Sequence, residues 1–191
     1  MLGHYKNAGA AYVDAGDKKF GQRTVLLHNR GEGRFEEWPN PGDLGKLRMA
    51  ARGTAVADLD GDGAVDLVIV DLDGPVRVLR NTAAADRGWI EILPQSAPDG
   101  RTPIGTRVRV TAGGRTQSQT FRVSSSYASG SLVALHFGLG AAEQADTVEV
   151  RWPSGRIRSF SHVPGRKAYA IAPDGELHAP GVPSAPARGA R

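Results

Sequence analysis

The chain contains no cysteine, which excludes disulfide bonds, zinc sites built on thiolates and thiol nucleophiles, although it leaves the cellular compartment open. It also lacks any apolar run that approaches the ~18 residues of a membrane-spanning helix, so we expect no membrane span. The first residues have no apolar segment of the kind found in signal peptides.

Glycine and proline are abundant instead, with 25 and 12 among the 191 residues. This composition favours many turns and short strands over long helices. The length suits one ordinary domain or two small ones. We therefore predict an all-β protein.

Charge is unevenly distributed along the chain. Residues 1–86 carry 11 Lys or Arg and 13 Asp or Glu, a net charge of −2, whereas residues 87–191 carry 13 and 7, a net charge of +6. A basic region suits nucleic acid or an anionic polysaccharide. Because no run of basic residues and no nucleic-acid motif accompanies it, we interpret the arginines as a solvated surface and expect no nucleic-acid partner. Polyanion binding is the weaker alternative.

The most informative stretch is residues 58–66, a loop with carboxylates at its positions 1, 3, 5 and 9. Like charges this close repel one another, and a hard cation removes that cost. Ca²⁺ takes six to eight oxygen ligands, which side chains, the backbone carbonyl at position 7 and water can supply. Gly63, at position 6, permits a tight turn. We predict a Ca²⁺ site whose ligands are Asp58, Asp60, Asp62, the Ala64 carbonyl and Asp66.

The loop begins like an EF-hand but ends differently. An EF-hand has a bidentate Glu at position 12 and a helix on each side, whereas position 12 here is Ile69. The flanking residues 54–57 and 67–70 have the pattern of short buried strands. The prediction is a strand–loop–strand calcium site, and the alternative is an Asp- and Gly-rich turn that binds no metal.

Alternating apolar residues and turn residues divide the chain into three parts. Within residues 1–86 we expect strands at 24–28, 34–38, 53–57, 66–70 and 76–81, in the layout of one propeller blade. Residues 87–172 predict a run of hairpins, with strict alternation at 107–111 and a two-residue turn at Gly113 and Gly114. The Pro-, Ala- and Gly-rich residues 173–191 predict a disordered tail.

Two family resemblances follow from these motifs. Residues 24–81 resemble the VCBS/FG-GAP repeat of calcium-bearing β-propellers, through Asn29, Gly31, Gly33, Phe35 and the loop at 58–66. Residues 88–163 resemble the ASPIC/UnbV domain that accompanies such repeats, through residues 104–108, 112–117, 126–127, 135–140 and 148–155. The resemblances imply a partial β-propeller blade followed by a small antiparallel β-sandwich or barrel.

The same resemblances imply a function. Members of this group carry a propeller of seven or eight blades before the ASPIC/UnbV domain, so this chain is expected to be the C-terminal part of a longer protein, with the upstream blades as partners. The implied role is calcium-binding, non-enzymatic adhesion or recognition of a protein or glycan, in a secreted, periplasmic or cell-surface location. The alternative is an accessory protein or enzyme component in enediyne-type secondary metabolism or polysaccharide processing.

A few other residues have two possible interpretations. The serines within residues 124–129, together with His136, suggest a Ser/His nucleophile, but no Gly-x-Ser-x-Gly motif accompanies them, so a polar loop is the better interpretation. We expect His136 to be buried and hydrogen-bonded rather than a ligand or base. We expect Trp38, Trp89 and Trp152 to pack within strands rather than stack on sugars.

Overall fold

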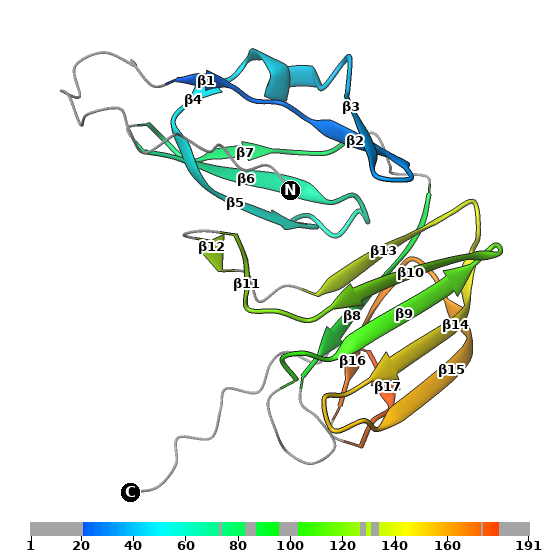
Figure 1. Ribbon diagram of the computed structural model, residues 1–191. Helices are drawn as coiled ribbons and strands as arrows, with labels where there is room; N and C mark the ends of the chain where they lie inside the picture. The colour runs from blue at the N-terminus through cyan, green and yellow to red at the C-terminus, as the bar shows by residue number, and fades with distance from the viewer. Residues whose placement is uncertain are drawn as a thin grey trace, which may run out of the picture. The chain divides into compact units, whose positions relative to one another are not determined.

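The computed structural model describes residues 21–72, 74–82, 87–95, 103–126, 129–130, 134–172 and 174–179. Contacts between Cα atoms divide the chain into two compact units. The first unit contains the described residues up to 59, residues 65–81 and those around 124–131, and the second contains residues 60–64, 82–123 and those from 132 onward. Figure 1 shows the strands of both units, coloured from blue to red along the chain.

Strands dominate the described part of the chain. Its one helical element is a short 3-10 helix, η1 (Gly42–Lys46). The predicted all-β class is therefore confirmed. None of the described residues belongs to a helix with the length and apolar character needed to cross a lipid bilayer.

The described part of the first unit contains one three-stranded sheet and three two-stranded ribbons. The sheet is an antiparallel meander of β5 (Ala51–Ala57), β6 (Asp66–Asp71) and β7 (Arg77–Leu79). The ribbons pair β1 (Gln22–Arg23) with β4 (Arg48–Met49), β2 (Leu27–Gly31) with β3 (Arg34–Glu37), and β11 (Ser124–Ser126) with β12 (Ser129–Gly130).

The β2–β3 hairpin illustrates how the sequence makes these turns. Gly31, Glu32 and Gly33 all have left-handed backbone angles, with φ of 90°, 52° and 74°. The Oδ1 atom of Asn29 accepts a hydrogen bond from the N–H of Gly31 at 2.8 Å, which fixes the start of the turn. The two strands expected at 24–28 and 34–38 therefore form a hairpin, although the first of them runs from Leu27 to Gly31.

The first unit has a small core and a well-exposed apolar surface. The buried residues Leu44, Met49, Ala51 and Ile69 form its core, which packs against one face of the β5–β6–β7 sheet. Side chains alternate between the two faces of a strand. On the opposite face, Val70 and Val78 are 46% and 62% exposed.

Two four-stranded sheets make up the second unit. The antiparallel sheet has the order β10-β9-β14-β15, and the mixed sheet has the order β13-β8-β16-β17, in which β16 runs parallel to β8. The strands of the first are β9 (Arg107–Ala112), β10 (Arg115–Thr120), β14 (Gln144–Arg151) and β15 (Ile157–Pro164). Those of the second are β8 (Gly88–Pro94), β13 (Leu135–Gly140), β16 (Lys167–Ile171) and β17 (Leu177–His178).

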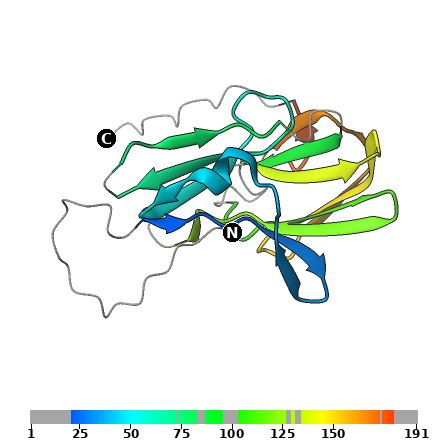
Figure 2. The ribbon, with the colours of Figure 1, turned by 90° about the horizontal axis from the view of Figure 1, so that it is seen from above.

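The two sheets share one hydrophobic core, so the second unit is a β-sandwich. In β9, Val108 and Val110 are fully buried whereas Arg107 and Arg109 are exposed, which confirms the predicted alternation. Figures 1 and 2 show a tight turn joining β9 to β10. The core residues come from both sheets and include Ile90, Ile92, Phe137, Val148, Val150, Trp152 and Ile171.

The turn between β9 and β10 has the predicted form. Gly113 and Gly114 have φ of 53° and 75°. A two-residue hairpin turn of this kind needs positive φ at both central positions, which glycine adopts without a steric penalty.

Some elements differ from the sequence prediction. The strands expected in a single blade are divided between sheets, because β2 and β3 pair with each other and not with β5–β6–β7. Strand β13 continues through Gly138 to Gly140, where glycines would predict the end of a strand, because Gly138 still pairs with Trp89 of β8.

The expected C-terminal tail also contains regular structure. Residues 174–179 include β17, which pairs with β16 through the main chain. Pairing with an existing sheet edge offsets the weak strand tendency of this Pro- and Gly-rich stretch. Residues 1–20, residues 83–86 at the expected boundary between the first two parts, and the tail from residue 180 onward lie outside the described residues.

Candidate metal centre

The acidic loop joins β5 to β6 and closes an antiparallel hairpin. Ala57, the last residue of β5, pairs with Asp66, the first residue of β6. Gly61 and Gly63 within the loop have φ of 78° and 88°, which allow the chain to reverse. The loop thus lies between two paired strands, as the flanking sequence indicated.

Three of the predicted ligands lie close together in this loop. Carboxylate oxygens of Asp58, Asp60 and Asp66 are all within 4.8 Å of one another. Oxygens bound to one Ca²⁺ lie about 2.3–2.6 Å from the ion, so two of them can be up to about 5 Å apart. Two carboxylates 4.8 Å apart repel by roughly 1 kcal/mol in bulk water and about 3–4 kcal/mol at the effective dielectric constant near a protein surface. The spacing and the hard-oxygen chemistry therefore both fit Ca²⁺.

Asp66 is the buried member of this trio. It is 3% exposed, and its two carboxylate oxygens accept hydrogen bonds from the backbone N–H groups of Leu59 at 3.0 Å and Asn81 at 2.8 Å. An ionised carboxylate has about four lone-pair sites, so these bonds leave acceptor capacity for a cation. The backbone therefore holds Asp66 in place, while Asp58 is half-buried and Asp60 is exposed.

The remaining two predicted ligands are placed differently. Asp62 lies outside the trio, and its Oδ1 accepts a hydrogen bond from the N–H of Ala64 at 2.8 Å. Ala64 itself is buried. The N–H of Asp62 donates to Oδ1 of Asp60 at 3.3 Å. These local hydrogen bonds order the loop around the carboxylates. Coordination by Asp62 and by the Ala64 carbonyl stays a prediction.

The middle of the loop packs against two aromatic rings of the second unit. The Nε2 atom of His136 lies 2.9 Å from the carbonyl oxygen of Gly63, and because a carbonyl only accepts, Nε2 carries the proton and donates it. The His136 ring is nearly parallel to that of Trp89, with ring centroids 6.0 Å apart. A Cβ on Gly63 would lie only 1.9 Å from Nε1 of Trp89.

The structure shows contacts of Gly63, Trp89 and His136 that the sequence alone did not specify. The predicted hydrogen bond of His136 is confirmed, although its side chain is half-buried rather than fully buried. Gly63 is needed both for its backbone angle and for its contact with an indole ring. No local sequence signal links Gly63 to residues 26 and 73 positions further along the chain.

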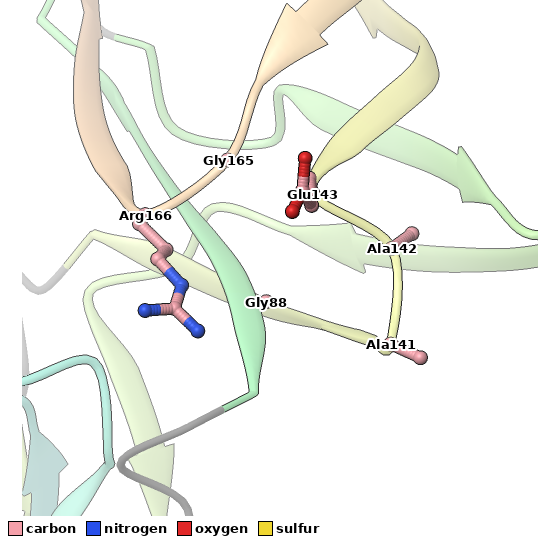
Figure 3. Close-up of a pocket in the computed structure, with 6 residues that line it drawn as sticks. All are labelled: Gly88, Ala141, Ala142, Glu143, Gly165 and Arg166. Carbon is pink, nitrogen blue, oxygen red and sulfur yellow. The ribbon is translucent and has the colours of Figure 1, made fainter.

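Two hollows open on the second unit beside this cluster. The larger has a volume of about 590 Å³, and it is lined by Gly63, Arg87, Gly88, Trp89, Ala112, Gly113, Arg115, Gln117, His136, Gly138, Leu139, Gly140, Ala141 and Ala142. The smaller has a volume of about 430 Å³ and is lined mostly by glycine and alanine, with Glu143 and Arg166 as its charged residues (Figure 3).

Close backbone packing shapes the floor of the smaller hollow. A Cβ on Gly88 would lie 2.0 Å from the carbonyl oxygen of Ala142, and one on Gly165 would lie 2.6 Å from that of Glu143. The N–H of Gly165 donates to the same Glu143 oxygen at 2.8 Å, and the N–H of Arg166 donates to the Trp89 carbonyl at 2.7 Å. These glycines allow the chain segments to approach one another.

Comparison with known proteins gives two kinds of match. Residues 96–177 match the family model described as ASPIC and UnbV. The chain is also similar to cartilage acidic protein 1, with 29% identity to the Mus musculus protein over 150 residues and 28% identity to the Homo sapiens protein over 148 residues. The alignments cover 72% and 71% of this chain but only 21% of either relative, so the chain spans about a fifth of their length. Residues 96–177 are therefore similar to the ASPIC and UnbV family model, and they overlap the stretch at 88–163 whose motifs carry that resemblance.

Proposed function

We propose that this chain is part of a calcium-stabilised, non-enzymatic recognition module that acts outside the cytoplasm. The observation that carries the proposal is the approach of the Asp58, Asp60 and Asp66 carboxylates to within 4.8 Å of one another. In this interpretation Ca²⁺ neutralises the carboxylates and fixes the end of the β5–β6 hairpin, while Asp62, the Ala64 carbonyl and water complete its coordination.

We further propose that the loop belongs to a VCBS/FG-GAP repeat in the last blade of a propeller. The exposure of Val70 and Val78 on one face of the β5–β6–β7 sheet supports this, because a repeat unit buries such a face against its neighbours. The partners of the first unit are then other blades of the same propeller. A protein or glycan is the external ligand.

The location and the non-enzymatic role have their own support. The relatives are named for cartilage, a tissue rich in extracellular matrix. Extracellular calcium modules bind the ion at about 10⁻⁴–10⁻³ M. Carboxylates that meet at one point suit a cation better than the separated acid and base of a glycosidase. The Nε2 atom of His136 is engaged by the backbone carbonyl of Gly63.

Thermal unfolding with and without Ca²⁺ tests this function. A ligand that binds the folded state stabilises it by RT ln(1 + [L]/Kd), so about 10 mM Ca²⁺ adds about 1.4–2.7 kcal/mol for a Kd of about 10⁻³–10⁻⁴ M. This corresponds to a rise in the midpoint of roughly 3–10 °C, relative to chelator. If Ca²⁺ leaves the midpoint unchanged, the metal site is disproved.

The Asp60→Asn variant sharpens the test, because Asp60 is exposed and its replacement removes one charge without opening a cavity. In chelator the variant should be at least as stable as the wild type, since repulsion among the carboxylates falls. In Ca²⁺ it should lose most of the gain. Asp146→Asn is the matched control, because Asp146 is also exposed but lies in β14 away from the loop, and it should keep the full response.

A further inference from the structure

The larger hollow of the second unit has features of a ligand site that the calcium proposal does not use. Its volume of about 590 Å³ lies within the range of small-molecule pockets. Among the described residues that line it there is no Asp or Glu, whereas Arg87 and Arg115 both line it. The site therefore presents positive charge within a concave surface.

The two arginines are available to a ligand. Both are exposed, and neither makes an ion pair or a side-chain hydrogen bond with another described residue. By contrast, two other polar side chains of the lining are already engaged: Gln117 donates to the Gly138 carbonyl at 2.6 Å, and His136 bonds to the Gly63 carbonyl at 2.9 Å. These bonds hold the walls in place, and the two guanidinium groups are the charged donors that the lining offers.

Glycine produces the open space in front of Trp89. Gly138 of β13 pairs directly with Trp89 of β8, so no side chain crosses from the neighbouring strand to cover the half-buried indole ring. A Cβ on Gly138, Gly113 or Gly140 would meet nothing within 4 Å. Part of an aromatic ring thus borders a recess that also contains two guanidinium groups.

We propose that this hollow binds an acidic saccharide. The carboxylate or sulfate group bonds to Arg87 and Arg115, because a planar guanidinium matches both oxyanions with paired hydrogen bonds. The apolar face of the sugar ring lies against the uncovered part of Trp89. This assigns a ligand class to the recognition role proposed above and rests on that role.

Calorimetric titration of the full chain with four probes tests the proposal. The probes are a uronic-acid disaccharide, a sulfated disaccharide, a neutral disaccharide and inorganic sulfate. Both acidic disaccharides should bind, and the neutral sugar and sulfate alone should bind at least tenfold more weakly. Arg87→Ala and Arg115→Ala should each weaken binding of the acidic sugars by about tenfold or more.

Two further variants separate specific binding from general charge attraction and from misfolding. Gly138→Leu should abolish binding while the chain stays folded, because the φ of Gly138 is not left-handed and the added side chain enters open space. Arg156→Ala removes an exposed arginine that does not line the hollow, and it should bind as the wild type does. Circular dichroism and thermal unfolding of each variant verify the fold.

Three results would overturn the proposal: no binding of either acidic disaccharide, equal binding of inorganic sulfate, or an equal loss in Arg156→Ala. The calcium proposal is judged separately from the unfolding midpoints in Ca²⁺ and chelator. A Ca²⁺-dependent midpoint without sugar binding rejects the saccharide site alone, and sugar binding without a Ca²⁺ response rejects the metal site alone.

Discussion

Substitution of Gly63 by alanine should strongly destabilise the second unit. The φ of Gly63 is 88°, a backbone angle that costs a residue with a Cβ about 1–2 kcal/mol of conformational energy. The new Cβ would also lie 1.9 Å from Nε1 and 2.1 Å from Cδ1 of Trp89. Overpacking of this kind costs about 1–3 kcal/mol, because the ring must move. The free energy of unfolding should therefore fall by about 2–5 kcal/mol.

The neighbouring loop glycine provides a matched control. Gly61 has a similar φ of 78°, but a Cβ there would meet nothing within 4 Å. Gly61→Ala should therefore lower the free energy of unfolding only through its unfavourable φ, by about 1–2 kcal/mol. Urea denaturation followed by circular dichroism measures both values, and tryptophan fluorescence reports on the displaced ring. Equal losses in the two variants would refute the packing argument, as would an unchanged cost of Gly63→Ala in a Trp89→Ala background.

Two further predictions concern the second unit. The Nε2 atom of Gln119 donates to the His136 carbonyl at 2.5 Å, so Gln119→Ala should lower the free energy of unfolding, measured in urea, by about 1 kcal/mol. Gln119→Glu should lower it further, because two acceptors would then face each other. An equal or smaller loss in Gln119→Glu would contradict this prediction. Burial raises the pKa of Tyr169, whose hydroxyl donates to the Pro164 carbonyl at 2.9 Å. The contribution of Tyr169 to stability should therefore be complete below the pKa of about 10 in the unfolded chain, and it should decline as pH rises through the pKa in the folded chain. Tyr169→Phe should flatten this alkaline decline in thermal unfolding scans, and an unchanged slope would exclude the assignment.

The sequence predicted local structure well where one physical rule dominates. Alternation of Arg and Val over residues 107–110 specifies one buried and one exposed face, and paired glycines specify the turn at 113–114. The spacing of Asp58, Asp60 and Asp66 was sufficient to bring their carboxylates together around one point. The alternation and the glycine turn depend on interactions within a few residues, whereas Asp66 is also held by the N–H of Asn81, which the spacing did not indicate.

Partnerships between distant segments were not predictable in the same way. The residue pattern predicts strands at 89–93 and 167–172, but nothing in either stretch indicates that they pair in parallel. Strand β17 was missed because its stability depends on the edge of β16 rather than on its own composition.

The parallel pairing of β8 with β16 has a consequence for synthesis of the chain. Ile90 pairs with Lys167, so the two central strands of one sheet are separated by most of the second unit. Until β16 has left the ribosome, strand β8, which contains the core residues Ile90 and Ile92, lacks its parallel partner. Contacts this distant in sequence slow folding and prolong the exposure of apolar strands. We expect the sandwich to fold late and as a whole, with nascent chains that end before β16 relying on chaperones to remain soluble.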